Sequence, residues 1–200
     1  MWYTYFVIIM NNIFDWFNSF IDSLVNNLSI TSALICCFLI TIESIVPILP
    51  LFAFITVNFL VFGKILGFLI SYIFTVIGCS LSFFLFRKLK LSYFKKKKKE
   101  AGKIINTLNK IKLTHLAVVL AVPFTPAFAV NIAAALSKMP YKKYLVSLLI
   151  GKIFLVYFWG FVGTGLLDSI KNPIEIIKIG VMMFIAYIIS IIINKKYKLD

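Results

Sequence analysis

The sequence predicts an all-α polytopic membrane protein. We expect an inverted repeat of two re-entrant, proline-broken hairpins, each followed by spanning helices, with an N-terminal amphipathic helix in front. Three observations favour this fold class. The 200 residues are 62% hydrophobic with a mean hydropathy of +1.00, which is more apolar surface than a soluble domain of this size can bury. A Pro-x-x-Pro-x-Phe-Ala motif occurs twice in apolar sequence. Of the 21 basic residues, 17 fall on segments that this path places on one side of the membrane.

Two proline pairs mark the hairpins, within residues 43–63 and 118–139. Proline lacks a backbone donor and clashes with the preceding helical turn, so neither stretch is expected to be one straight spanning helix. Broken backbone is tolerated in lipid only where protein or a water-filled cavity surrounds it, and matching interruptions in two halves point to a transport site. Two kinked spanning helices with structural prolines are the alternative. The motifs contain Pro47, Pro50, Phe52 and Ala53, then Pro123, Pro126, Phe128 and Ala129, and the asparagines that follow are Asn58 and Asn131.

The chain divides into three parts. Residues 1–28 contain no Lys or Arg and predict an interfacial amphipathic helix rather than a cleaved signal peptide. Residues 29–194 are expected to form one membrane domain, in which the apolar segment 29–42 leads the chain into the first hairpin. Residues 195–200 are a basic tail. Within the membrane domain we expect spanning helices at 63–86, 144–166 and 174–193, and the second hairpin at about 114–137.

The distribution of charge predicts the orientation. Residues 87–112 carry 11 of the 21 basic residues, including an unbroken run from Lys95 to Lys99. The positive-inside rule places this loop and the C-terminus in the cytoplasm, in a multi-pass protein of the plasma membrane. The loop is either a solvated segment that sets the topology or a surface that recruits phosphate headgroups. On this path the first hairpin enters from outside and the second from inside.

Few side chains could carry chemistry. Glu43 is expected near membrane depth, where a charge costs about 3 kcal/mol or more, so it is either a functional carboxylate that could carry a proton or a helix-end residue in interfacial water. Lys152 either pairs with Glu43, meets a lipid phosphate or snorkels to the inner interface. Asn58 and Asn131 either donate to a headgroup or satisfy broken backbone. The predicted transport path comprises Glu43, Pro47, Pro50, Asn58, Pro123, Pro126, Asn131 and Lys152, and the candidate headgroup-binding residues are Arg87, Lys138, Lys142 and Lys143.

The sequence displays no signature of covalent chemistry. Cys36, Cys37 and Cys79 lie in apolar runs without metal or disulfide spacing and are expected to be packing residues. His115 is the only histidine and has no second ligand type nearby. No nucleophile–base pair or phosphate-cradling glycine loop appears, so we expect no enzyme, no metal and no cofactor. The basic charge is expected to attract anionic lipid rather than nucleic acid.

The order and spacing of these features resemble the DedA superfamily. The resemblance rests on Glu43, the first Pro-x-x-Pro, the Phe-Gly at residues 62–63 and the helix that ends in Arg-Lys. The second half, beginning PFTPAFAVNIAAALSKMPYKK, is similar to the SNARE-associated Golgi protein branch, the bacterial relatives of VTT-domain proteins. The similarity covers roughly residues 40–167. It implies opposed re-entrant hairpins and lipid movement between leaflets, either as recycling of polyprenyl-phosphate carriers with proton-linked homeostasis or as phospholipid scrambling.

The chain departs from this family's pattern at its charged positions. Leu51 and Phe52 stand where many members have an acidic residue after the first proline pair. Leu120 and Pro126 stand where many have arginine, and Ala135 replaces a usual glycine. The carboxylate–arginine machinery that the family implies is therefore largely missing here.

We therefore expect an integral membrane lipid transporter of the scramblase type. It would move phospholipid or polyprenyl-phosphate-type lipids between leaflets and support membrane homeostasis. The alternatives are a proton- or ion-coupled transporter of a small solute and a membrane scaffold that transports nothing. The expected partners are membrane lipids with anionic headgroups, with protons and a second copy of the chain as further candidates.

Overall fold

The computed structural model describes residues 29–46, 50–89, 111–125, 127–168 and 173–197, together with Ser19, Ile105 and residues 107–109. The elements within these residues are all helices, which confirms the all-α class. The predicted interfacial helix at 1–28 lies outside the described residues except for Ser19, and so does most of the basic loop 87–112. The helices are α2 (Ile30–Glu43), α3 (Leu51–Leu89), α5 (Leu113–Ala121), α6 (Ala127–Leu136), α7 (Tyr141–Asp168) and α8 (Pro173–Tyr197).

Three of these helices are long and apolar enough to cross a bilayer. They are α3, α7 and α8, and they correspond to the three spanning helices that the sequence predicts. A span needs about 20 apolar residues because the hydrocarbon core is about 30 Å thick and a helix rises 1.5 Å per residue. The 28 residues of α7 exceed that length. The protein is therefore built as a membrane protein.

Helix α3 is two helices that reverse at a single residue. Gly63 has φ 75° and ψ 174°, a backbone conformation that glycine adopts readily and other residues do not. The Asn58 side-chain amide donates to the Ser71 hydroxyl at 3.0 Å. Thirteen residues of straight helix would separate these groups by about 20 Å, so residues 51–62 fold back against the long arm 64–89. The spanning part of α3 is this long arm.

The first hairpin consists of α2 and residues 51–62, with the turn that begins at residues 44–46 between them. This corrects the expected boundaries, in which the hairpin began at Glu43 and residues 29–42 preceded it. In the structure Glu43 ends the entering arm and lies at the tip of the hairpin. The reason is length, since 14 residues are too few to span and instead pack against the returning arm. Residues on both arms, including Cys36, Ile40, Phe54 and Ile55, share one buried cluster.

The second hairpin consists of α5, the turn at 122–125 and α6, close to the expected residues 114–137. Val122 leaves the helix with an extended backbone, φ −81° and ψ 126°, which is the conformation that a following proline favours. Pro123 is buried in this turn, while Pro126 lies outside the described residues, as does Pro47 in the first turn. In both halves the described helices end before the segment that contains the proline pair and resume after it.

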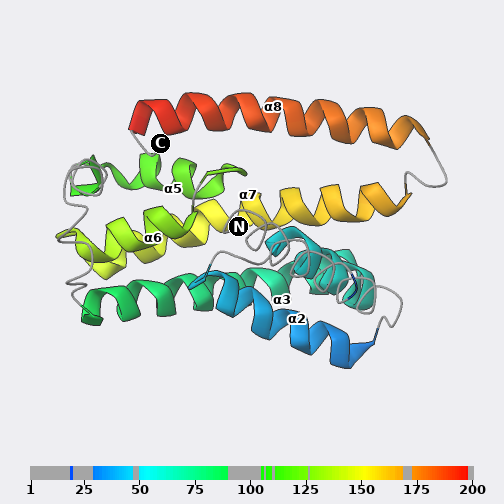
Figure 1. Cartoon of the computed structure of the whole chain (residues 1–200), viewed down its shortest axis with the longest axis horizontal. Helices are drawn as coiled ribbons and strands as arrows, with labels where there is room; N and C mark the ends of the chain where they lie inside the picture. The colour runs from blue at the N-terminus through cyan, green and yellow to red at the C-terminus, as the bar shows by residue number, and fades with distance from the viewer. Residues whose placement is uncertain are drawn as a thin grey trace, which may run out of the picture.

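The two hairpins point toward each other (Figure 1). The first enters from the end of the molecule where α7 finishes, and the second enters from the end where α7 begins, so that both tips lie near the middle of the long helices. Helix α7 contacts both of them. A Cβ on Gly151 would lie 2.6 Å from the Ala117 carbonyl oxygen of α5, and a Cβ on Gly163 would overlap the Thr56 side chain of the first hairpin. Helix α7 therefore approaches both hairpins closely at positions where it has glycine.

Each hairpin is fixed to its long helix by one buried asparagine. Asn58 joins Ser71 and also contacts the Cys37 sulfur at 3.7 Å, which links all three arms of the first half. Asn131 accepts a hydrogen bond from the Tyr144 hydroxyl at 2.8 Å, which joins α6 to α7. The three cysteines are buried and free, in agreement with a packing role. The two asparagines thus occupy corresponding structural positions in the two halves.

Candidate functional site

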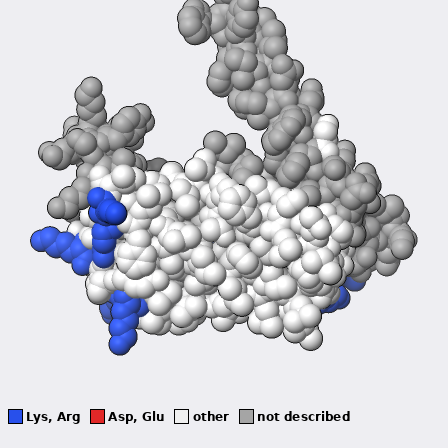
Figure 2. Space-filling model, turned by 90° about the horizontal axis from the view of Figure 1, so that it is seen from below, with Lys and Arg blue, Asp and Glu red and all other residues white. Residues whose placement is uncertain are grey.

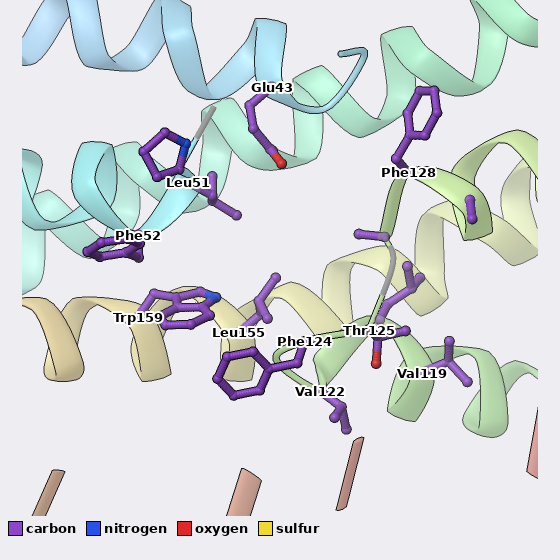
Figure 3. A pocket seen from close by; sticks show the side chains of 14 residues that line it. Glu43, Leu51, Phe52, Val119, Val122, Phe124, Thr125, Phe128, Leu155 and Trp159 are labelled. Atoms are coloured by element: carbon purple, nitrogen blue, oxygen red, sulfur yellow. The ribbon is translucent and has the colours of Figure 1, made fainter. Parts of the chain in front are cut away.

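The candidate site is a cavity of about 400 Å³ between the two hairpin tips. The first hairpin contributes Glu43 and the segment that starts at Pro50, and the second contributes its turn and the start of α6. Helix α7 contributes Leu155 and Trp159. In Figure 3, Phe52 and Phe128 lie at opposite sides of the cavity with the Glu43 side chain between them. These two phenylalanines occupy the same place in the two repeated motifs, so both motifs contribute an equivalent side chain to the cavity.

Trp159 connects the two hairpin tips. Its ring lies 5.8 Å from the Phe52 ring of the first hairpin and 5.4 Å from the Phe124 ring of the second, in a T-shaped arrangement. Offset and T-shaped aromatic pairs each contribute about 0.5–1.5 kcal/mol beyond their buried area. Trp159 therefore joins the two tips through aromatic contacts, and all three rings line the cavity.

The site combines one carboxylate with one buried ammonium group. Glu43 lines the cavity, and Lys152 is 1% exposed and interacts electrostatically with it. Lys152 precedes Leu155 and Trp159 by three and seven residues on α7, which places it on the face of the helix that lines the cavity. In the described part of the chain, no ion pair within 4.0 Å and no hydrogen bond engages the Lys152 ammonium group.

The burial of Lys152 bears on the three environments expected for it, which are a pair with Glu43, contact with a lipid phosphate and the inner interface. A lysine that snorkels to the interface would expose its ammonium group, but this side chain is enclosed in the middle of α7. A direct pair with Glu43 is not formed either. Burying an ion without a contacting partner costs several kcal/mol. Lys152 therefore lies enclosed beside the cavity, behind the residues that line it.

The tip of the second hairpin carries a strained residue. Phe124 has φ 63° and is the one non-glycine residue with positive φ among those described. Such a conformation costs of the order of 1–3 kcal/mol, and residues that adopt it cluster at functional sites. The neighbouring Thr125 hydroxyl oxygen is buried and has no hydrogen-bond partner in the described structure. Both residues line the cavity, so its wall carries an unsatisfied polar atom and a strained turn.

The predicted transport-path residues divide into three groups. Glu43 and Pro50 line the cavity, and Lys152 lies beside it. Asn58 and Asn131 are buried and hydrogen-bonded away from the lining residues. Pro123 is buried in the turn of the second hairpin and does not line the cavity, and Pro47 and Pro126 are outside the described residues.

The predicted headgroup-binding residues lie at one end of the molecule, away from the cavity. Arg87 donates to the carbonyl oxygens of Ala135, Ser137 and Met139 at 3.1, 3.3 and 2.7 Å, which caps the end of α6. Lys143 donates to a backbone carbonyl oxygen at residue 111. The two side chains of this group that remain exposed are Lys138 and Lys142.

Arg87 is expected to stabilise the second half of the fold through these bonds. Arg87→Lys loses the forked geometry that reaches three carbonyls and should lower the free energy of unfolding by about 1–3 kcal/mol. Thermal unfolding in detergent measures the change, and the exposed Lys88→Gln serves as the control. Equal melting temperatures for the two variants would contradict a capping role.

Positive charge is unevenly distributed along the molecule. Figure 2 shows blue side chains at the two ends of one face and an uncharged band between them. The end where α3 and α8 finish carries most of the described cations, and the opposite end carries Lys64 and Lys178. The cations of the first end are Arg87, Lys88, Lys112, Lys138, Lys142, Lys143, Lys195 and Lys196.

Sequence reasoning missed Trp159 and the tip residues Phe124 and Thr125. Tryptophan is normally expected at the membrane interface, so one within a span is a usable signal. The spacing from Lys152 through Leu155 to Trp159 is a second signal, since these positions share a helix face. The strain at Phe124 leaves no mark in the sequence.

Comparison with known proteins agrees with this architecture. A family model described as "VTT domain" matches residues 46–165, which include the returning arm of the first hairpin, the second hairpin and most of α7. The chain is 30% identical over 145 residues to "Uncharacterized membrane protein YhjE" of Bacillus subtilis (strain 168), and the match covers 71% of this chain and 70% of that protein. No solved structure matches the chain.

Proposed function

This chain belongs to the VTT-domain family, among the DedA and SNARE-associated membrane proteins, and we propose that it moves lipids with phosphate-bearing headgroups between the leaflets of the plasma membrane. One observation carries the proposal. The cavity between the opposed hairpin tips has mainly apolar walls, yet it contains the Glu43 carboxylate and adjoins the buried Lys152 ammonium group. An amphiphile whose headgroup is anionic fits this combination of surfaces.

The placement of the cavity in the bilayer follows from helix lengths. The hairpin arms have between 9 and 14 residues, whereas crossing the hydrocarbon core takes about 20. We therefore treat both hairpins as re-entrant, with tips near the midplane, and the positive-inside rule assigns the end with Arg87 and the C-terminal lysines to the cytoplasm. A site at the midplane between inverted halves can be reached alternately from either side.

The residues of the site have distinct roles in this mechanism. Lys152 lowers the cost of bringing a phosphate into the low-dielectric middle of the membrane. Glu43 compensates the Lys152 charge when no headgroup is present. When a phosphate arrives, its negative charge replaces that of Glu43 as the partner of Lys152. The aromatic contact of Trp159 keeps the tips together, so that water does not fill the path.

The proposal is tested in proteoliposomes. Purified protein should accelerate leaflet exchange of fluorescent phospholipid or of polyprenyl phosphate, and Ala129→Phe, which fills the cavity wall, should reduce the rate about tenfold or more, equivalent to at least about 1.4 kcal/mol. Ile65→Phe, on a side chain that is 77% exposed, is the matched control and should exchange lipid like the wild type.

The same assay separates the alternatives. A wild-type protein that exchanges neither lipid, although correctly inserted, would contradict the proposal. Proton uptake coupled to a solute gradient would then favour a small-solute transporter that uses Glu43. No transport of either kind would favour a scaffold.

A further inference from the structure

A second space lies between α7 and α8, outside the cavity described above. Its volume is about 550 Å³, within the range of sites that bind small molecules. Its described lining contains no charged side chain. The principal walls are Phe154, Phe158 and Phe161 of α7, Ile185 and Ile189 of α8, and Pro123 of the second hairpin. We call this space the α7–α8 groove.

The groove meets the cavity at the tip of the second hairpin. Val122 belongs to the lining of both spaces. Phe124 lies at the boundary, because it lines the cavity while its ring contacts Trp159 of α7 at 5.4 Å and Tyr187 of α8 at 6.2 Å. The strained turn is therefore the partition between an apolar groove and a cavity that contains charge.

We propose that the α7–α8 groove binds the hydrocarbon chain of the lipid whose headgroup occupies the cavity. This inference rests on the proposed function and adds a tail site to it. Helices α7 and α8 are both long enough to span, so the medium around the groove at this depth is hydrocarbon. Because Val122 belongs to both linings, the groove lies directly beside the headgroup site, across the turn of the second hairpin.

The composition of the groove favours a lipid chain over a second copy of the protein. Helices that associate in membranes approach through small residues. Ala121 and Ala186 are the two small residues in the described groove lining, which is otherwise formed by large side chains. Phe154 projects from α7 with 63% of its surface exposed, which would keep another helix away but leaves room for a thin, flexible chain.

The test uses a phospholipid that carries a photoactivatable diazirine in its acyl chain, reconstituted with the full-length protein. After illumination and proteolysis, adducts should map to the groove segments of α7 and α8 several-fold more than to the lipid-exposed start of α8. Ile185→Trp, which projects into the groove, should reduce these adducts and lipid exchange about tenfold, or about 1.4 kcal/mol. Ile177→Trp is the control, because Ile177 is 67% exposed on the same helix and does not line the groove.

The outcomes separate this inference from the proposed function. Groove adducts without any lipid exchange would support the tail site and contradict transport. Exchange with uniform labelling, unaffected by Ile185→Trp, would overturn the tail site and leave transport intact. Disulfide-linked dimers from Ile185→Cys, in place of groove adducts, would overturn it in favour of a second copy. Repeating the assay with photoactivatable polyprenyl phosphate identifies which type of chain the groove accepts.

Discussion

Lys152→Met should abolish exchange of phosphate-bearing lipids while leaving the protein as stable as the wild type or more stable. The Lys152 side chain is 1% exposed and has no contacting counter-ion among the residues that the structure describes, so its charge is expected to destabilise the folded state. Replacing buried ions by apolar residues of similar size is often neutral or stabilising by about 1–4 kcal/mol. Methionine fills the same space without the charge that we assign to phosphate binding.

Glu43→Gln should have the opposite effect on stability. It removes the negative charge that acts on Lys152 and leaves the ammonium group uncompensated. Because the two groups are not in direct contact, the loss of unfolding free energy should fall below the roughly 3–5 kcal/mol that breaking a direct buried pair costs. The double variant should regain stability, since no buried charge then remains to be compensated.

Thermal unfolding and lipid exchange are measured on the wild type, Lys152→Met, Glu43→Gln and the double variant. Together they give the interaction free energy between the two side chains. Lys178→Met, at an exposed position of α8, controls for loss of a lysine elsewhere. A large loss of stability in Lys152→Met would show that the ammonium group supports the fold. Normal exchange by the same variant would remove Lys152 from the mechanism.

The division of the chain into two related halves could be predicted because the signals are local and repeated. A proline pair disfavours a continuous helix wherever it occurs, so the interruptions after α2 and after α5 follow from the sequence. Spanning length and apolar composition likewise locate α7 and α8. The assignment of the chain to its family, which rests on the order of these same features, is confirmed.

The reversal at Gly63 could not be predicted in this way. Glycine inside a helix costs only about 1 kcal/mol relative to alanine, so an isolated glycine in a long apolar run is compatible with a continuous helix. The reversal depends on contacts between residues distant in sequence, such as the hydrogen bond from Asn58 to Ser71. If the reversal at Gly63 is not known, residues 29–42 resemble the start of a spanning helix. Glu43 is then assigned to the beginning of the hairpin instead of its tip.

The candidate site was predictable only where a residue is chemically unusual in its surroundings. Glu43 and Lys152 are conspicuous because charges are rare in apolar segments. Trp159 and Phe124 are two among many aromatic residues in this sequence, and their importance comes from their position between the two tips. That position depends on how α7 packs against both hairpins, which no local pattern specifies.

Gly163→Ala should weaken the docking of the first hairpin on α7. A Cβ at this position would overlap the Thr56 side chain, whose hydroxyl donates to the Phe52 carbonyl oxygen at 2.8 Å. Added volume in a packed contact costs about 1–3 kcal/mol because side chains or backbone must move. Since Phe52 lines the cavity, the displacement should reach the site and slow lipid exchange as well as lower the melting temperature.

Gly180→Ala, in the spanning helix α8, should instead raise the free energy of unfolding. No atom lies within 4 Å of a Cβ at Gly180, and alanine stabilises a helix interior by about 0.5–1 kcal/mol relative to glycine.

Thr56→Ala, combined with Gly163→Ala, removes the hydroxyl and methyl that the new Cβ meets and should restore part of the stability. If Gly163→Ala and Gly180→Ala both raise the melting temperature, the close contact at Gly163 does not hold the first hairpin against α7. A loss confined to Gly163→Ala and relieved by Thr56→Ala locates that contact between the two helices, because helix propensity alone predicts a gain at both glycines.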